Sequence, residues 1–159
     1  MKRFLVILAL ALALAGCSGT AKGSNTKVLT NEEWADVITG IQSEMELPAM
    51  MNLSDVEITD ILGINAENLE SYTVQFPMMI VHASAIMVFQ AKEGTIETVK
   101  EEVGAWLTSY EEQWSTYLPD QYELVKNRVE KQVGDSTYVV IIAEDAASIE
   151  AKIDAALAE

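Results

Sequence analysis

Tyr138-Val-Val-Ile-Ile-Ala143 is an unbroken apolar run of strand length. Such a run is typical of a central strand that is covered on both faces or by large helices. Just before it, Gly134-Asp135 indicates a two-residue hairpin turn. Leading up to the turn, three valines lie in phase at positions 125, 129 and 133. The sequence therefore predicts an antiparallel hairpin near the C-terminus.

Two helices flank this hairpin in the sequence. Between Thr95 and Tyr117 the apolar residues recur every three or four positions, with glutamates and a lysine between them, which predicts the longest helix of the chain. A last helix is predicted from about Asp145 to Ala158, with Ile149 and Ile153 on its apolar stripe. We expect both helices to pack on the sheet.

The N-terminal half begins with a capping-box pattern, Thr30 followed by Glu33, and predicts a helix that ends near Leu47-Pro48. A second, short helix is predicted from Ser54 to Leu62, stopped by Gly63. Two strands are predicted after it, at residues 72–81 and 85–91, and Pro77 makes the first one irregular or an edge strand.

Together these elements predict an α+β fold in one domain, residues 30–159. We expect a two-layer sandwich with an antiparallel sheet of about four strands, helices packed on one face, and two N-terminal helices before it. The 159 residues are 50% hydrophobic and 22% charged, a composition that supports one core and excludes intrinsic disorder.

The N-terminus has the pattern of an export signal. Lys2 and Arg3 precede a twelve-residue apolar run, too short to cross a bilayer as a helix, which predicts a signal peptide at residues 1–16. The tetrapeptide Leu14-Ala15-Gly16-Cys17 resembles the lipobox of bacterial lipoproteins, which implies diacylglycerol on the Cys17 thiol and cleavage just before it. Small and polar residues follow, so residues 17–29 are expected to be a lipidated cysteine and a flexible tether.

The signal peptide pattern and the lipobox together predict a lipid-anchored protein on the extracytoplasmic face of the cell membrane. Removal of residues 1–16 leaves 143 residues with a formal charge of −17, and no disulfide can form because Cys17 is the only cysteine. Nucleic acid is excluded as a partner, because its binding needs clustered cations.

The whole pattern resembles a bacterial lipoprotein family called domain of unknown function 4358. The features that carry the resemblance are the lipobox, the helix that closes on Gly63-Ile64, Tyr72 at a strand start, Phe89-Gln90-Ala91-Lys92 at a strand end, and Tyr117-Leu118-Pro119 after the long helix. They span about residues 47–153. The resemblance implies a cell-surface lipoprotein of Gram-positive, clostridia-like bacteria, and it carries over no activity and no catalytic residues.

Few residues offer chemistry. With Cys17 lipidated and His82 the only histidine, no zinc or other transition-metal site is expected, and we expect no cofactor beyond the covalent lipid. His82 and Ser84 lie two residues apart and could form a hydrolase pair, but no Gly-x-Ser-x-Gly elbow accompanies them. We therefore expect no catalytic residues, and the small hydrolase remains the less favoured alternative.

A binding surface is the remaining hypothesis. Paired methionines favour core filling or a deformable apolar surface over a Cu(I) site. An exposed Trp34 beside Met50 and Met51, with His82, would make such a surface. We expect a non-catalytic binding or scaffolding protein of the cell envelope that contacts the membrane through its anchor and binds an envelope protein. A single-domain carrier of a small ligand is the alternative.

Overall fold

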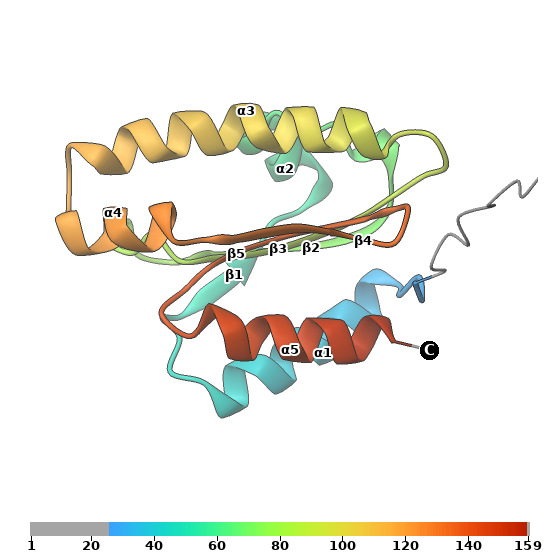
Figure 1. Cartoon of the computed structure of the whole chain (residues 1–159), viewed down its shortest axis with the longest axis horizontal. Helices are drawn as coiled ribbons and strands as arrows, with labels where there is room; N and C mark the ends of the chain where they lie inside the picture. The colour runs from blue at the N-terminus through green and yellow to red at the C-terminus, as the bar shows by residue number, and fades with distance from the viewer. Residues whose placement is uncertain (1–25, 159) are drawn as a thin grey trace, which may run out of the picture.

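The computed structural model describes residues 26–158 (Figure 1). The predicted signal peptide, the predicted lipidation site Cys17 and most of the predicted tether lie outside the described residues. The described elements are α1 (Asn31–Glu44), β1 (Met50–Asn52), α2 (Asp55–Leu62), η1 (Ala66–Asn68), β2 (Leu69–Pro77), β3 (Ala85–Ala91), α3 (Ile96–Ser115), α4 (Pro119–Lys126), β4 (Val129–Val133), β5 (Thr137–Ile142) and α5 (Ala146–Leu157).

The strands form one antiparallel sheet in the order β1-β2-β3-β5-β4. The α+β class is therefore confirmed, whereas the sheet has five strands among the described residues rather than about four. The extra strand is β1, three residues long, which pairs with the end of β2. β3 and β5 lie at the centre, and every residue in both is buried.

Helices cover both faces of this sheet, so the prediction of a single covered face is wrong. α2, α3 and α4 lie on one side, with α1 and α5 on the other (Figure 1). Alternate β5 residues supply the two cores: Val140 and Ile142 lie with α3, and Val139 and Ile141 with α1 and α5. A strand that is apolar at every position is buried on both faces, and the helices α1 and α5 together cover the second face.

Around the hairpin and at the end of β2, the structure differs from three of the local predictions. Val125 does not belong to a strand: it is fully buried in α4, an unpredicted helix that begins with Pro119 at a first-turn position where proline is well tolerated. The hairpin itself is present, but three residues connect β4 to β5, with Gly134 at φ +60°. β2 ends at Pro77, so residues 78–81 form a loop rather than the end of a strand.

A buried glutamine ties the start of the described chain to the sheet. The side chain of Gln90 is fully buried in β3. Its Oε1 accepts from Leu29 N at 2.7 Å, Ser71 Oγ at 2.9 Å and Trp34 Nε1 at 3.2 Å. Its Nε2 donates to the Lys27 carbonyl at 2.8 Å and also lies 3.3 Å from Thr137 Oγ1. One amide therefore holds the segment before α1, α1 itself and two further strands.

Among residues 26–158, no helix is both long and apolar enough to cross a membrane.

Candidate functional site

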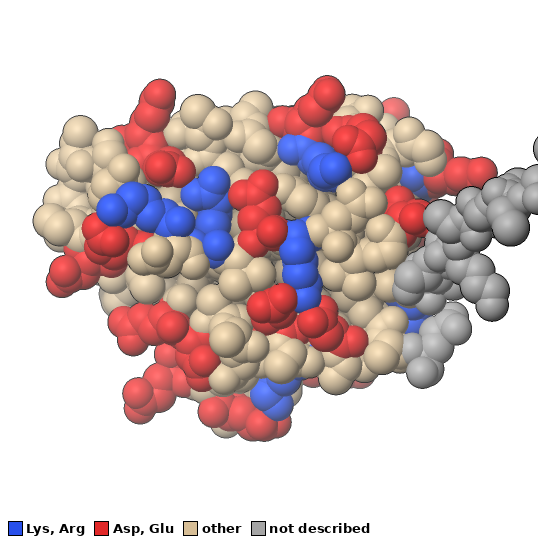
Figure 2. All heavy atoms as spheres, viewed as in Figure 1, with Lys and Arg blue, Asp and Glu red and all other residues tan. Residues whose placement is uncertain are grey.

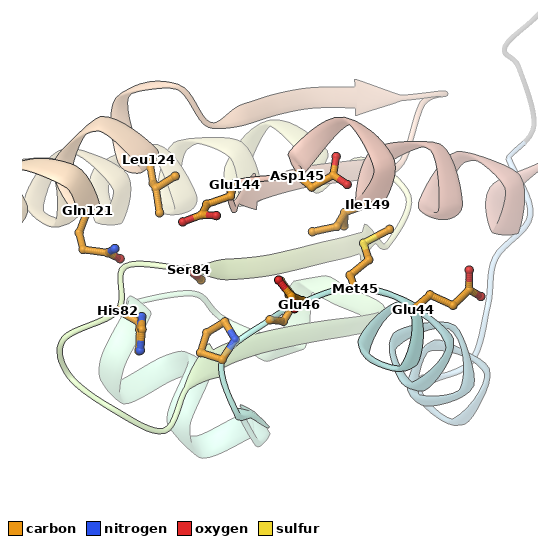
Figure 3. Close-up of a pocket in the computed structure, with 12 residues that line it drawn as sticks. Glu44, Met45, Glu46, His82, Ser84, Gln121, Leu124, Glu144, Asp145 and Ile149 are labelled. Atoms are coloured by element: carbon orange, nitrogen blue, oxygen red, sulfur yellow. The ribbon is translucent and has the colours of Figure 1, made fainter.

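A cavity of about 580 Å³ opens at the end of the sheet where α1 ends and α5 begins. Five segments meet there: the end of α1, the link from α1 to β1, the residues before β3, the start of α4, and the junction of β5 with α5 (Figure 3). Its walls are formed by Glu44, Met45, Glu46, Leu47, Pro48, His82, Ser84, Gln121, Leu124, Glu144, Asp145 and Ile149.

One wall of the cavity is held rigidly through the peptide groups of Ala83. The N–H of Ala83 donates to Gln121 Oε1 of α4 at 2.8 Å, and its carbonyl accepts from the Tyr110 hydroxyl of α3 at 3.1 Å. Ala83 is itself fully buried. The two neighbours, His82 and Ser84, are therefore presented to the cavity from a fixed backbone.

Ser84 is the unusual polar group of this wall. The residue is 7% exposed, and within residues 26–158 its hydroxyl, which keeps access to the cavity, makes no hydrogen bond. Ser84 Oγ therefore offers an unused donor and acceptor to whatever enters the cavity.

The cavity is also strongly acidic. Four carboxylates line it, and only that of Glu44 has a cation partner in the described chain, Lys152 Nζ at 2.7 Å. Asp145 caps α5 by accepting from the Ser148 N–H at 3.3 Å, while Glu46 and Glu144 take part in no ion pair of the described residues. The charge of this site is thus left uncompensated by the protein.

Apart from Lys152, the cations that form ion pairs in the described chain bind carboxylates outside the cavity wall. On the face shown in Figure 2, lysines and arginine lie among carboxylates rather than in a patch of their own. Lys131, for example, lies 2.5 Å from Glu150 and 2.7 Å from Asp154. Partial burial lowers the pKa of Lys131, but the bonds to these two carboxylates outweigh it and the net shift is upward. These pairs neutralise the flank of the molecule and leave the cavity negative.

An exposed apolar loop adjoins the cavity. The four residues Met78–Val81, which we call the apolar loop, are 66%, 56%, 87% and 42% exposed. Its first residue is fixed to the link before β1, because Met78 N donates to the Ala49 carbonyl at 2.8 Å. Its last residue precedes His82 of the cavity wall. The apolar loop and the cavity therefore form one continuous end of the molecule.

The predicted binding surface is only partly assembled. Trp34 is fully buried and bonded to Gln90 at the other end of the sheet, so it contributes no surface. Met50 is half-buried against the α1/α5 core, whereas Met51 is 41% exposed. β1 lies beside the end of β2, which brings both methionines near the apolar loop, and half-buried His82 lines the cavity.

The hypothetical hydrolase pair shares this cavity, since both His82 and Ser84 line it. Within residues 26–158, however, no hydrogen bond joins the imidazole to the hydroxyl, as nucleophile activation by a base requires. In the same part of the chain no three His, Cys, Asp or Glu side chains lie close enough to hold a metal ion. The cavity carboxylates are therefore spread around its wall rather than gathered at one point.

Sequence reasoning missed the residues that define this end of the molecule. Nothing in the local sequence distinguishes Glu46 and Glu144 from other surface carboxylates, because the two residues come to line one cavity only when the chain folds. The apolar loop could have been found from the sequence, because all four residues that follow Pro77, Met78–Val81, are apolar. A proline that ends a strand, followed by four apolar residues, indicates an exposed apolar run.

Comparison with known families identifies the chain. The family model described as Domain of unknown function (DUF4358) matches residues 43–155, well over half of the sequence. The chain belongs to this family. Every residue of the cavity and of the apolar loop falls inside the DUF4358 match, whereas Cys17 and Trp34 fall outside it. No curated protein and no solved structure matches the chain significantly.

Proposed function

We propose that this chain is a lipid-anchored extracytoplasmic binding protein that uses the cavity and the apolar loop to hold a partner at the cell envelope. The observation that carries the proposal is the run of four exposed apolar side chains beside the cavity. Soluble domains rarely keep such a run in water unless a partner covers it. The activity is non-catalytic.

The position of this surface fits a tethered protein. Lys27 N donates to the carbonyl of Leu157, the last residue of α5, whereas the cavity lies at the first turn of the same helix. A twelve-residue helix is about 18 Å long. The described chain therefore starts at one end of the domain, and the proposed binding surface lies at the other (Figure 1). An anchor at Cys17 would attach the domain to the membrane through the end opposite the binding surface and leave that surface free for a partner.

Site-directed cross-linking in living cells tests this function. A photoreactive residue placed at Ile80, which is 87% exposed, should join the protein to one partner recovered in near-equal amount. The same residue placed at Ile61, an exposed isoleucine of α2, is the matched control. The product should disappear with Cys17→Ala. Equal labelling from both positions, or no product at all, would remove the partner-binding function.

The anchor is tested separately by fractionation. Cys17→Ala should leave an unprocessed form or shed the protein into the medium, because the thiol that would carry diacylglycerol is gone. Membrane attachment that survives this change would contradict the lipoprotein assignment.

The cavity supports a second candidate, a carrier of a small ligand. Its volume of about 580 Å³ lies within the range of about 300–1,000 Å³ that is usual for ligand sites. A carrier would be stabilised against heat by one class of metabolite, since a ligand that binds only the folded state raises its stability. That result, without any cross-linked partner, would favour the carrier.

A further inference from the structure

Resting on the proposed function, we infer that the partner is a protein segment in which a lysine or arginine side chain enters the cavity while flanking apolar side chains cover the apolar loop. The inference concerns the chemistry of the partner, which the binding function by itself leaves open.

The cavity walls match a basic side chain over its whole length. The carboxylates of Glu46 and Glu144, which have no cation partner in the described chain, place negative charge on the cavity wall that attracts the cationic head. The apolar walls from Met45, Leu47, Leu124 and Ile149 can pack on its aliphatic stem. Ser84, a residue that is only 7% exposed, adds a hydroxyl that reaches the cavity and has no hydrogen-bond partner in the described chain. Lysine and arginine carry only donors, so a spare acceptor beside free carboxylates complements them.

The apolar loop argues for a protein segment rather than a small amine. An amine in the cavity would leave Met78–Val81 in water, because these residues do not line the cavity. A segment with apolar side chains next to its basic residue covers both features at once. Methionines suit this contact, since their flexible thioether side chains adapt to differently shaped partners.

A membrane surface fits these features poorly. An apolar loop can insert among lipids, but here it adjoins four carboxylates in a chain whose formal charge is −15. Anionic headgroups would repel that end of the molecule. It also lies at the opposite end from residue 26, where the described chain begins.

A second copy of this chain also fits poorly. Within residues 26–158, six of the seven cations are in ion pairs with carboxylates of the same chain. The seventh, Lys92, donates from Nζ to the carbonyl of Glu67 at 2.8 Å. Within residues 26–158, Lys92 is thus the one basic side chain without a carboxylate partner, and its ammonium is already bonded to a backbone carbonyl, so a different, basic partner fits the acidic cavity better.

A peptide series tests the inference on the mature protein purified from its own cells in detergent. The probe is an acetylated peptide with one arginine between pairs of leucines. In one matched peptide neutral citrulline replaces arginine, and in another serines replace the leucines. Methylguanidine and vesicles containing anionic lipid are the two remaining probes.

Methyl-labelled methionines report where each probe binds. Met45 lines the cavity, Met78 and Met79 lie in the apolar loop, and Met87 is fully buried as an internal control. The arginine peptide should shift the NMR signals of the first three and leave Met87 unchanged. Citrulline or serine peptides should bind at least about tenfold more weakly, and added salt should weaken the arginine peptide.

Paired variants locate the contact. Glu46→Gln and Glu144→Gln should each weaken the arginine peptide by about three- to tenfold, while Glu101→Gln, on the exposed side of α3, should change it by less than about twofold. Ile80→Ser should weaken binding in the same way, with Ile61→Ser as its control.

Four outcomes would overturn the inference: equal affinity for the arginine and citrulline peptides, full affinity for methylguanidine alone, shifts produced only by anionic vesicles, or no binding by any probe. If the cross-link from Ile80 still recovers one partner in any of these cases, the proposed function stands and only the partner chemistry is wrong. If that cross-link is absent, the function itself fails.

Discussion

At the end of the sheet where the described chain starts, the fully buried Gln90 satisfies polar groups from the preceding segment, from α1 and from two strands. At the other end, the nearly buried Ser84 has no hydrogen-bond partner in the described chain, three of the four cavity carboxylates lack cations, and four apolar side chains are exposed. The same sheet thus ends in a completed polar network on one side and in unused polar and apolar groups on the other.

The difference between the two ends of the sheet indicates that the Gln90 end stabilises the fold, whereas the cavity end is available for binding. Completed networks such as that of Gln90 lower the free energy of the folded state and specify one arrangement of the core. A hydroxyl that reaches a cavity, such as that of Ser84, and an exposed apolar run add little to the stability of the fold, and proteins retain such groups where a ligand or partner completes the contacts. The comparison therefore predicts large stability effects at the Gln90 end and small ones at the cavity end.

The largest effect is expected for Gln90→Ala. This change removes a buried amide and leaves the Leu29 N–H, the Lys27 carbonyl and the Trp34 indole N–H without their partner. Each unsatisfied buried group costs about 1–3 kcal/mol, so we expect a loss of about 3–5 kcal/mol in the free energy of unfolding, measured by urea denaturation. Gln113→Ala, on the exposed side of α3, should change it by less than about 0.5 kcal/mol. A loss below about 1 kcal/mol for Gln90→Ala would break the comparison.

A smaller effect is expected at high pH through Tyr110, which holds the cavity wall. Burial raises the pKa of Tyr110 from 10.0 to about 12. Because the folded-state pKa lies above the unfolded one, the stabilisation is complete below pH 10 and declines as the pH rises towards 12. The contribution lost by pH 11 is about 1 kcal/mol.

Tyr110→Phe should therefore flatten the fall in unfolding free energy between pH 9 and about pH 11, as measured by urea denaturation at each pH. The matched control is Tyr117→Phe, which removes an exposed hydroxyl just after the end of α3. An unchanged alkaline slope in Tyr110→Phe would show that burial of this ring does not couple to stability.

Ser84→Ala should have little effect on folding, although Ser84 is as buried as many core residues. Its hydroxyl has no partner to lose within residues 26–158, so we expect a change within about 0.5 kcal/mol in either direction. Thermal unfolding measured by circular dichroism checks this. A loss of 2 kcal/mol or more would mean that the hydroxyl has a structural partner and would weaken the cavity as a binding site.

Ile80→Ser should leave the free energy of unfolding almost unchanged, because the side chain is 87% exposed and buries little area. Its visible effect should be on solution behaviour: less self-association at high protein concentration, followed by light scattering. If Ile80→Ser unfolds the domain instead, the apolar loop belongs to the core and is not a contact surface.

Much of the fold was predictable because it depends on local patterns. The capping box of Thr30 and Glu33 forms as expected, with Glu33 N donating to Thr30 Oγ1 at 3.2 Å. The carboxylate of Glu33 in turn accepts the Thr30 N–H, which lowers its pKa. The helical period of residues 96–115 and the strand at 85–91 also match closely. Sequence reasoning failed at α4, where Val125 shares the spacing of the strand valines but follows a proline suited to a helix start.

The site was far less predictable. Of the four residues assigned to a binding surface, Trp34 is buried, and only Met50, Met51 and His82 lie near the apolar loop and the cavity. Aromatic and methionine residues serve cores and surfaces alike, so their identity does not reveal their exposure. The carboxylates that make the cavity acidic come from segments 98 residues apart, Glu46 and Glu144.

The sequence by itself determined the type and approximate place of most elements, an apolar content sufficient for a core and the excess of negative charge, because periodicity, capping and composition are properties of short stretches of chain. Only the tertiary structure decided that helices cover both faces of the sheet, that Gln90 becomes a buried junction, and that Ser84, Glu46 and Glu144 share a cavity beside an apolar loop. These outcomes depend on which residues, distant in the chain, are brought into contact when both faces of the central strands are buried.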